Sequence, residues 1–109
     1  MKILIIRLSS IGDIVLTTPV IRCLKQQING SEIHFLTKKS YAAVLRYNPY
    51  IDKLHFWEKS AKKKIIKDLQ LQKFDYIIDL HHNFRTFSIK KQLKAKSFSF
   101  YKALSLIHI

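Results

Sequence analysis

Residues 2–13 read Lys-Ile-Leu-Ile-Ile-Arg-Leu-Ser-Ser-Ile-Gly-Asp, and they carry the strongest structural signal in this 109-residue chain. A short apolar run, typical of a buried β-strand, leads into a polar turn that contains a glycine. A helical pattern follows at once from Ile14. Such a strand–turn–helix is the first unit of a doubly wound α/β domain, in which ligands bind at the carboxyl ends of the strands. Asp13 is therefore predicted to lie where α/β domains carry their functional groups.

Strand and helix patterns alternate along the rest of the chain, with short links between them. Strands are predicted over Lys2–Leu8, Glu32–Thr37, Lys53–Trp57, Asp75–Leu80 and Ser97–Tyr101. Helices are predicted over Ile14–Ile28, Ser40–Tyr47, Ala61–Leu71 and Phe84–Leu93. The first helix is expected to end in a left-handed cap at Asn29-Gly30. The alternation predicts an α/β fold: a Rossmann-like parallel sheet with right-handed crossovers and flanking helices.

A length of 109 residues limits the chain to one domain, and its composition predicts that this domain is folded. Hydrophobic residues make up 48% of the sequence, which is too many for a disordered chain. Cys23 is the single cysteine, so no disulfide framework is possible and a reducing compartment is favoured. Arg7 interrupts the apolar N-terminal run, and no small-residue cleavage site follows it. We therefore expect a cytoplasmic protein.

The chain is strongly basic, with 20 Lys and Arg residues against 7 acidic ones and a net charge of +13. Such a surplus suits nucleic acid, an anionic lipid surface or a phosphorylated substrate. Lysines used simply as solvated surface residues explain it equally well. Charge alone does not decide between these partners.

The opening turn lacks two common nucleotide-binding motifs. Its only glycine is Gly12, so it is not a G-x-G-x-x-G loop, and it has no Lys-Ser/Thr end of a P-loop. Ser10-x-x-Asp13 fits a capping box, in which both side chains satisfy free amides at the helix start. A fixed, ionised carboxylate at that position also suits a general base. The two roles are compatible.

Polar residues follow every predicted strand, and a parallel sheet gathers them along one edge. This edge is expected to hold Asp13, Lys38, Lys39, His81, Asn83 and Arg85. Cations and hydrogen-bond donors of this kind suit an acidic, phosphorylated sugar. Adjacent His81 and His82 point to opposite faces and have no third ligand at a metal-site spacing, so no metal site is expected.

The opening motif resembles that of a known enzyme family. Residues 7–20, Arg-Leu-Ser-Ser-Ile-Gly-Asp-Ile-Val-Leu-Thr-Thr-Pro-Val, are similar without a gap to the start of glycosyltransferase family 9, the lipopolysaccharide heptosyltransferases. Residues 75–81, Asp-Tyr-Ile-Ile-Asp-Leu-His, resemble a later strand of that family. The resemblance covers the N-terminal half of the two-domain GT-B architecture and nothing of the other half.

The resemblance implies transfer of heptose, or a related sugar, from a nucleotide-sugar such as ADP-heptose to the lipopolysaccharide core, with inversion at the anomeric carbon. It implies that Asp13 takes the proton of the acceptor hydroxyl and that Ser9, Ser10 and Gly12 line the cleft. It implies no metal and no resident cofactor, because the nucleotide-sugar is a substrate held mainly by the absent C-terminal domain. His81 and His82 replace residues that are often Gln and a small residue in the family, so the choice of acceptor stays open.

Domain boundaries follow from the same resemblance. Residues 1–102 are expected to form the acceptor-side domain. Residues 103–109 are expected to be a non-native tail, because they form no clear strand or helix cap and their end resembles a translated sequencing adapter. Half a cleft does not orient two substrates, so the 109-residue chain alone is expected not to catalyse sugar transfer.

Lysine-rich helices leave further interpretations open. Residues 62–64 and Lys67 lie opposite the apolar positions of the helix 61–71, as on any core-packing helix with a charged outer face. The same lysines could attract an anionic inner-membrane surface and so serve a lipid-linked saccharide acceptor. Lys90, Lys91, Lys94 and Lys96 would extend that patch. The alternatives to a sugar transferase are a non-catalytic basic α/β module that binds nucleic acid or anionic ligands, and a small self-contained nucleotide-binding enzyme.

Overall fold

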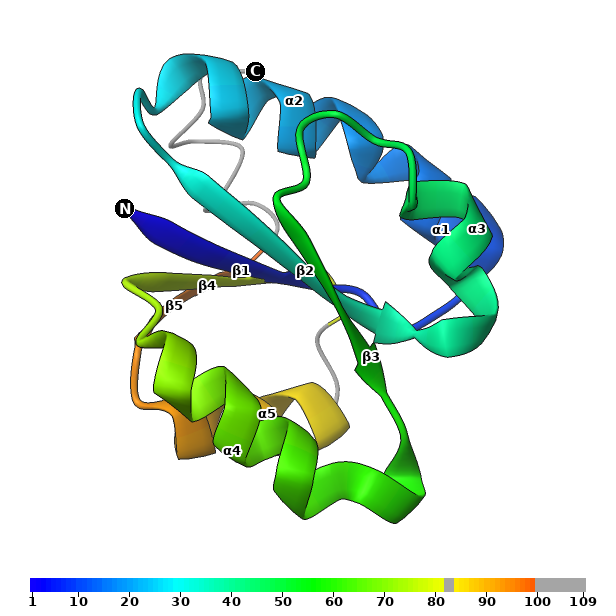
Figure 1. Cartoon of the computed structure of the whole chain (residues 1–109), viewed down its shortest axis with the longest axis vertical. Helices are drawn as coiled ribbons and strands as arrows, with labels where there is room; N and C mark the ends of the chain where they lie inside the picture. The colour runs from blue at the N-terminus through cyan, green and yellow to red at the C-terminus, as the bar shows by residue number, and fades with distance from the viewer. Residues whose placement is uncertain (82–83, 100–109) are drawn as a thin grey trace.

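A computed structural model describes residues 1–81 and 84–99 of the chain, which form a parallel five-stranded sheet with helices on both faces (Figure 1). The strands are β1 (Lys2–Ile6), β2 (Glu32–Lys38), β3 (Lys53–Trp57), β4 (Tyr76–Asp79) and β5 (Lys96–Ser99). Their order across the sheet is β3-β2-β1-β4-β5, and each neighbouring pair is parallel. The predicted α/β fold with a parallel sheet is confirmed.

The helices form one layer on each face of the sheet (Figure 1). They are α1 (Ile11–Leu16), α2 (Thr18–Gln27), α3 (Ala42–Leu45), α4 (Lys62–Gln72) and α5 (Phe84–Leu93), with short 3₁₀ turns η1 (Lys39–Tyr41) and η2 (Lys59–Ala61). The three helices α1 to α3 cover one face, while α4 and α5 cover the other (Figure 1).

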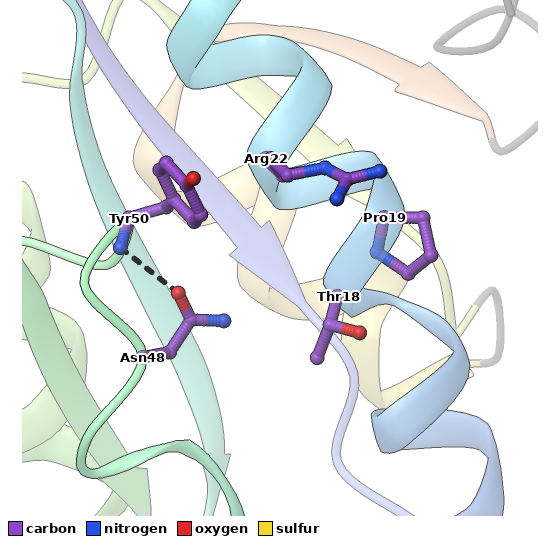
Figure 2. A pocket seen from close by; sticks show the side chains of 5 residues that line it. All are labelled: Thr18, Pro19, Arg22, Asn48 and Tyr50. Atoms are coloured by element: carbon purple, nitrogen blue, oxygen red, sulfur yellow. Dashed lines mark hydrogen bonds between the residues drawn. The ribbon is translucent and has the colours of Figure 1, made fainter.

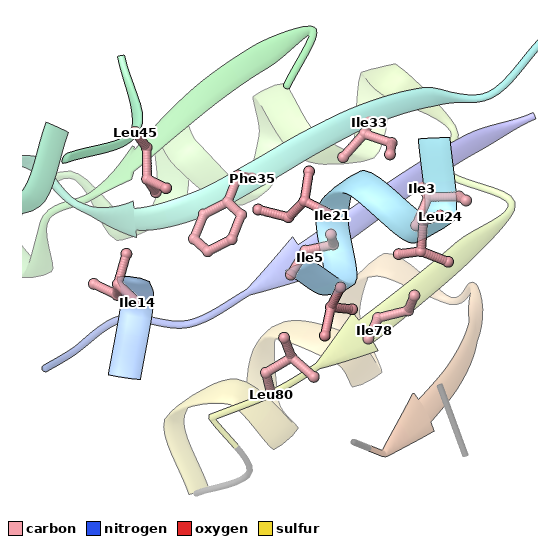
Figure 3. Packing of buried hydrophobic residues seen from close by; sticks show 11 residues of the cluster. Ile3, Ile5, Ile14, Ile21, Leu24, Ile33, Phe35, Leu45, Ile78 and Leu80 are labelled. Carbon is pink, nitrogen blue, oxygen red and sulfur yellow. The ribbon is translucent and has the colours of Figure 1, made fainter. Parts of the chain in front are cut away.

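Two apolar clusters hold the layers to the sheet. Figure 3 shows the first, in which Ile14 of α1, Ile21 of α2 and Phe35 of β2 pack together with the odd-numbered side chains of β1. The second lies on the other face and joins the even-numbered side chains of β1 to Ile66 of α4 and Ile89 of α5. The central strands are buried on both faces, because parallel sheets carry helices on each side.

The first predicted helix is wrong in one respect, because the structure breaks Ile14–Ile28 into α1 and α2 at Thr17. Pro19 lacks an N–H group, and its ring would clash with the carbonyl of Val15 in a continuous helix. That carbonyl instead accepts a hydrogen bond from Thr18 Oγ1 at 2.8 Å, and Thr17 Oγ1 donates to the Ile14 carbonyl at 2.6 Å. These side chains satisfy the last carbonyls of α1 where the helix stops.

Most other boundaries agree with the prediction to within one or two residues. The bounds of β3 and α5 are those predicted. Gly30 has a left-handed conformation with φ of 75°, but it does not cap the helix as predicted, because α2 ends at Gln27 and its C-cap is Ile28 in an extended conformation. The segment predicted as one helix over Ser40–Tyr47 is shorter, because it forms the 3₁₀ turn η1 before the single-turn α3. The predictions for His82, Asn83 and residues 100–109, including the tail 103–109, fall outside the described residues.

Three polar side chains, Glu32, His34 and His55, form a hydrogen-bonded series on the face of the sheet that α4 covers. His34 is 1% exposed, and its Nε2 lies 3.0 Å from Glu32 Oε1 while its Nδ1 lies 2.8 Å from His55 Nε2. The two imidazole rings stack at 5.1 Å between centroids, and the Phe74 ring meets the His34 ring edge-on. Burial lowers the pKa of His55 to about 4, with the neighbouring charges of His34 and Lys53 acting in the same direction.

Candidate active site

The candidate site lies at the carboxyl edge of the sheet, where the end of β1 meets the start of α1. Ile6 pairs with Leu36 of β2 on one side and with Asp79 of β4 on the other. The turn after β1 is therefore level with the ends of both neighbouring strands. This arrangement lets residues that are 73 positions apart in sequence, such as Arg7 and Leu80, meet at one place.

Asp13 is fixed through one of its two carboxylate oxygens. Ser10 is the N-cap of α1, and Asp13 at N3 completes the predicted capping box. Asp13 Oδ2 accepts hydrogen bonds from Ser10 Oγ at 2.9 Å and from the Ser10 backbone N–H at 3.5 Å. The Ser10 hydroxyl, followed by Arg7, lowers the pKa of Asp13 below its ordinary value. The carboxylate is half exposed, so it is both ionised and accessible.

Arg7 is the residue of this site that the sequence analysis missed. Its Nη2 lies 2.8 Å from Asp13 Oδ2, and its Nη1 donates to the Leu80 carbonyl at 2.7 Å. The guanidinium thus joins the ends of β1 and β4 to the start of α1. The signal was present in the sequence, since a charged residue interrupts an apolar strand six positions before the only acidic residue of the turn.

His81 lies on the β4 side of the same turn. Its backbone N–H donates to Asp79 Oδ1 at 2.9 Å, and its ring hydrogen-bonds to the backbone of Ser9. Burial, followed by the charge of Arg7, lowers the pKa of His81. The ring is therefore neutral at neutral pH and serves as a hydrogen-bonding group. Its Nδ1 is buried and has no hydrogen-bond partner among the residues the structure describes.

A buried ion pair between Asp79 of β4 and Lys90 of α5 lies next to this turn. Asp79 is 1% exposed, and its Oδ2 lies 3.0 Å from Lys90 Nζ of α5. The other oxygen of Asp79 holds the backbone of His81. Lys90 was expected on the outer lysine patch, and that expectation is wrong, because its side chain turns inward and forms an ion pair with the buried carboxylate of Asp79.

The remaining predicted site residues lie around this centre at different distances. Arg85 is exposed in the first turn of α5, and its charge reaches His81, whose pKa it helps to lower. Lys38 ends β2 at the same edge but forms no hydrogen bond or ion pair with Asp13, and Lys39 opens η1 beyond it. Asn83 lies outside the described residues. The structure thus brings together Ser9, Ser10, Asp13, His81 and Arg85, and leaves Lys38 at the periphery.

Gly12 presents an open surface beside Asp13. It lies inside α1, and a Cβ atom added there would meet no heavy atom within 4 Å. Glycine is a poor helix former, so the local fold alone does not favour it at this position. The bare backbone is consistent with the expected role of Gly12 in lining a binding cleft.

A hollow of about 250 Å³ lies apart from these residues, between α2 and the segment before β3 (Figure 2). Its walls are Thr18, Pro19, Arg22, Asn48 and Tyr50, and the Tyr50 N–H donates to Asn48 Oδ1 at 2.9 Å. None of the predicted site residues lines it. In the described ranges 1–81 and 84–99, no group of three His, Cys, Asp or Glu residues is placed to hold a metal ion.

Comparisons with known proteins agree on one group of enzymes. No protein-family profile matches the sequence. The chain is similar to lipopolysaccharide heptosyltransferase 1 of Campylobacter coli, with 29% identity over 107 residues, which are 94% of this chain and 31% of that protein.

Solved structures give the same result. The crystal structure of a family 9 glycosyl transferase from Veillonella parvula superposes with a TM-score of 0.73 and 27% identity, over 92% of this chain and 32% of that one. The ADP-heptose lipopolysaccharide heptosyltransferase II of E. coli superposes with a TM-score of 0.81 over 97% of this chain and 32% of that one; at 18% identity it speaks for the fold alone. The chain spans about a third of the length of these proteins.

Proposed function

We propose that this chain, which is similar to about a third of a lipopolysaccharide heptosyltransferase, forms the acceptor-binding part of a heptosyltransferase of lipopolysaccharide synthesis. The carboxylate geometry of Asp13 carries the proposal. Oδ2 is fully engaged by Arg7 and Ser10, whereas Oδ1 accepts no hydrogen bond from the described part of the chain. An acceptor hydroxyl can therefore approach Oδ1 while the other oxygen holds the group still.

In the proposed reaction, Asp13 takes the proton of the acceptor hydroxyl as that oxygen attacks the anomeric carbon of the sugar donor. The bond between that carbon and the nucleoside diphosphate breaks as the new bond forms on the opposite face, so the diphosphate leaves with the bonding electrons and the configuration of the carbon is inverted. The lowered pKa keeps Asp13 ionised at neutral pH, which a proton acceptor requires, but it also makes the carboxylate a weak base. Proton transfer is therefore expected to accompany bond formation, when the hydroxyl is most acidic.

We assign the acceptor, and not the donor, to this chain because its edge lacks a phosphate-gripping loop and offers dispersed polar groups. Arg85 supplies an exposed guanidinium, and the neutral ring of His81 lies beside it. Arg binds carboxylates and phosphates in a bidentate manner, so an acidic inner-core saccharide suits this edge. The donor is proposed to be a nucleotide-linked heptose such as ADP-heptose, with its diphosphate held by a second domain.

The test exchanges this chain for the matching segment of a complete relative. A chimaera carries the present chain in place of the aligned residues of the Campylobacter coli enzyme, and heptose transfer to a lipopolysaccharide core acceptor is measured. We expect Asp13→Asn to abolish transfer while leaving the circular dichroism spectrum and acceptor binding unchanged. Turnover by Asp13→Asn close to that of the parent chimaera would refute the role of Asp13 as the base.

A chimaera that folds poorly would not test the proposal, so a second measurement uses the present chain alone. Titration of the ¹⁵N-labelled chain with an acidic core saccharide is expected to shift the amide signals of Ser9, Ser10 and Gly12. Shifts confined to other parts of the chain would contradict an acceptor site at this edge.

A further inference from the structure

The outer side of the α4 and α5 layer forms one continuous helical surface. The two helices lie next to each other over the same face of the sheet (Figure 1), and Gln70 Nε2 of α4 donates to the Gln92 carbonyl of α5 at 3.0 Å. Their inner sides are used up by the core, with Ile66, Leu69 and Ile89 buried. The side chains on the outer sides of α4 and α5 are therefore available to contact a partner.

The outer sides are rich in cations. Lys63, Lys64 and Lys67 of α4 are exposed, as are Lys91 of α5 and Lys94 just after it. The only acidic residue in either helix is Asp68. No ion pair of these five lysines exists among residues 1–81 and 84–99, whereas Lys90 is excluded from this set by its contact with Asp79. The five charges therefore act outward, toward solvent.

Two large apolar side chains of the same helices are also exposed. Leu71 of α4 is 69% exposed and Phe87 of α5 is 60% exposed. Lys64, Lys67 and Leu71 follow the i, i+3, i+7 spacing of one helix face, and Phe87 precedes Lys91 and Lys94 with the spacing i, i+4, i+7. We name these six residues and Lys63 the α4–α5 surface.

One end of this surface, which carries Lys63, Lys64 and Phe87, adjoins the edge that carries Asp13. Both helices follow strands of a parallel sheet, so each begins at the carboxyl edge and runs away from it. Lys63 and Lys64 lie in the first turn of α4, and Phe87 lies in the first turn of α5. A partner bound to the α4–α5 surface would thus reach the same edge of the sheet as the candidate site.

We propose that the α4–α5 surface binds an anionic phospholipid bilayer. Lysine ammonium groups meet the lipid phosphates, and the ring of Phe87 and the side chain of Leu71 enter the boundary between headgroups and acyl chains. Nucleic acid would use the same charges, but exposed leucine gains nothing from a phosphate backbone. Binding to the bilayer is independent of sugar transfer; only its use in presenting a lipid-linked acceptor to Asp13 rests on the proposed function.

The experiment measures co-sedimentation of the full 109-residue chain with vesicles. One set contains phosphatidylglycerol and phosphatidylcholine in equal parts, and the other contains phosphatidylcholine alone. We expect binding to the anionic vesicles only, weakening as salt shortens the screening length. Each surface cation contributes about 1 kcal/mol near such a membrane, so Lys67→Gln with Lys91→Gln is expected to lower the partition coefficient about 30-fold.

A matched control removes the same charge from the opposite layer. Arg22→Gln with Arg46→Gln changes two exposed cations of the α1 to α3 side and is expected to lower binding only slightly. Equal losses for the two pairs would show that net charge alone acts, and would overturn the assignment of this surface. Phe87→Ser is expected to weaken binding to the anionic vesicles without changing its dependence on salt, since the ring contributes apolar contact and no charge.

Two further results would overturn the proposal. Equal binding to neutral and anionic vesicles would contradict the role of the lysines. Failure to bind either vesicle, combined with salt-sensitive binding of a single-stranded oligonucleotide, would assign the α4–α5 surface to nucleic acid.

Discussion

Acid is expected to destabilise this protein through the hydrogen-bonded series Glu32–His34–His55, in which His34 is buried and the other two side chains are partly exposed. Only one proton can lie between His34 Nδ1 and His55 Nε2 at 2.8 Å, so full protonation of both rings would force two N–H groups together. Burial lowers the pKa of His55 from 6.5 to about 4. The unfolded chain therefore takes up a proton below about pH 6.5, whereas the folded chain does not until about pH 4.

The sign and size of the effect follow from this difference. Between these two pH values the unfolded state binds more protons, so the free energy of unfolding falls as the pH falls. A fully buried group with this pKa difference would contribute about 3.4 kcal/mol. Because His55 is partly exposed, solvent screening reduces the expected loss to roughly 1–2 kcal/mol.

Urea unfolding at several pH values between neutral and about 4.5 measures this loss. Trp57 is the only tryptophan and is 6% exposed in the core beside α4, so its fluorescence reports global unfolding. The comparison is with His55→Gln, whose amide can still hydrogen-bond to His34 but does not titrate. We expect the stability of the variant to fall less over this range, by roughly 1–2 kcal/mol. Parallel pH profiles of the two proteins would refute the reasoning.

Three further predictions concern the candidate site. Replacing Arg7 by Met is expected to raise the pKa of Asp13, because the ion pair at 2.8 Å is lost. The carboxyl ¹³C chemical shift of Asp13, followed against pH, measures this pKa. An unchanged titration would show that Arg7 and Asp13 do not interact in solution. Gly12→Ala is expected to raise the free energy of unfolding in urea by roughly 0.5–1 kcal/mol, since alanine is a better helix former and its Cβ meets no other atom. The same change is expected to weaken binding of a core saccharide. A loss of stability would argue against an open surface at this position. Lys90→Met removes the ammonium group that pairs with the buried Asp79 carboxylate and is expected to lower the free energy of unfolding by roughly 3 kcal/mol. The same change at Lys91, which is exposed, should cost almost nothing in urea unfolding, and equal effects would show that the buried pair is unimportant.

Local patterns predicted the elements well where neighbours in sequence determine the conformation. β3 and α5 have the bounds predicted for them from the sequence. The prediction of one continuous first helix was wrong. The helical spacing of apolar residues continues across Thr17, so this spacing gives no sign of the break that Pro19 imposes. The apolar periodicity at this point favours a continuous helix, whereas Pro19 disfavours one, and the helix is interrupted in the structure.

In the candidate site, contacts between residues close in sequence could be predicted, whereas contacts between residues distant in sequence could not. Ser10 and Asp13 were predictable because a capping box involves residues three positions apart. Arg7 and the carbonyl of Leu80 are 73 positions apart, and their contact exists only because β4 pairs directly with β1. Sequence patterns identify strands but do not give the order in which those strands pair.

By itself, the sequence determined the α/β class, the strand–turn–helix at residues 2–16 and the placement of Asp13 at a helix start. These properties depend on turn chemistry and on burial periodicity, which act over a few residues. The tertiary structure alone decided that Arg7 holds Asp13, that Lys90 turns inward to Asp79, and that Leu71 and Phe87 are exposed. Each of these depends on which elements pack together, because a side chain's partner and exposure are set by neighbours in space.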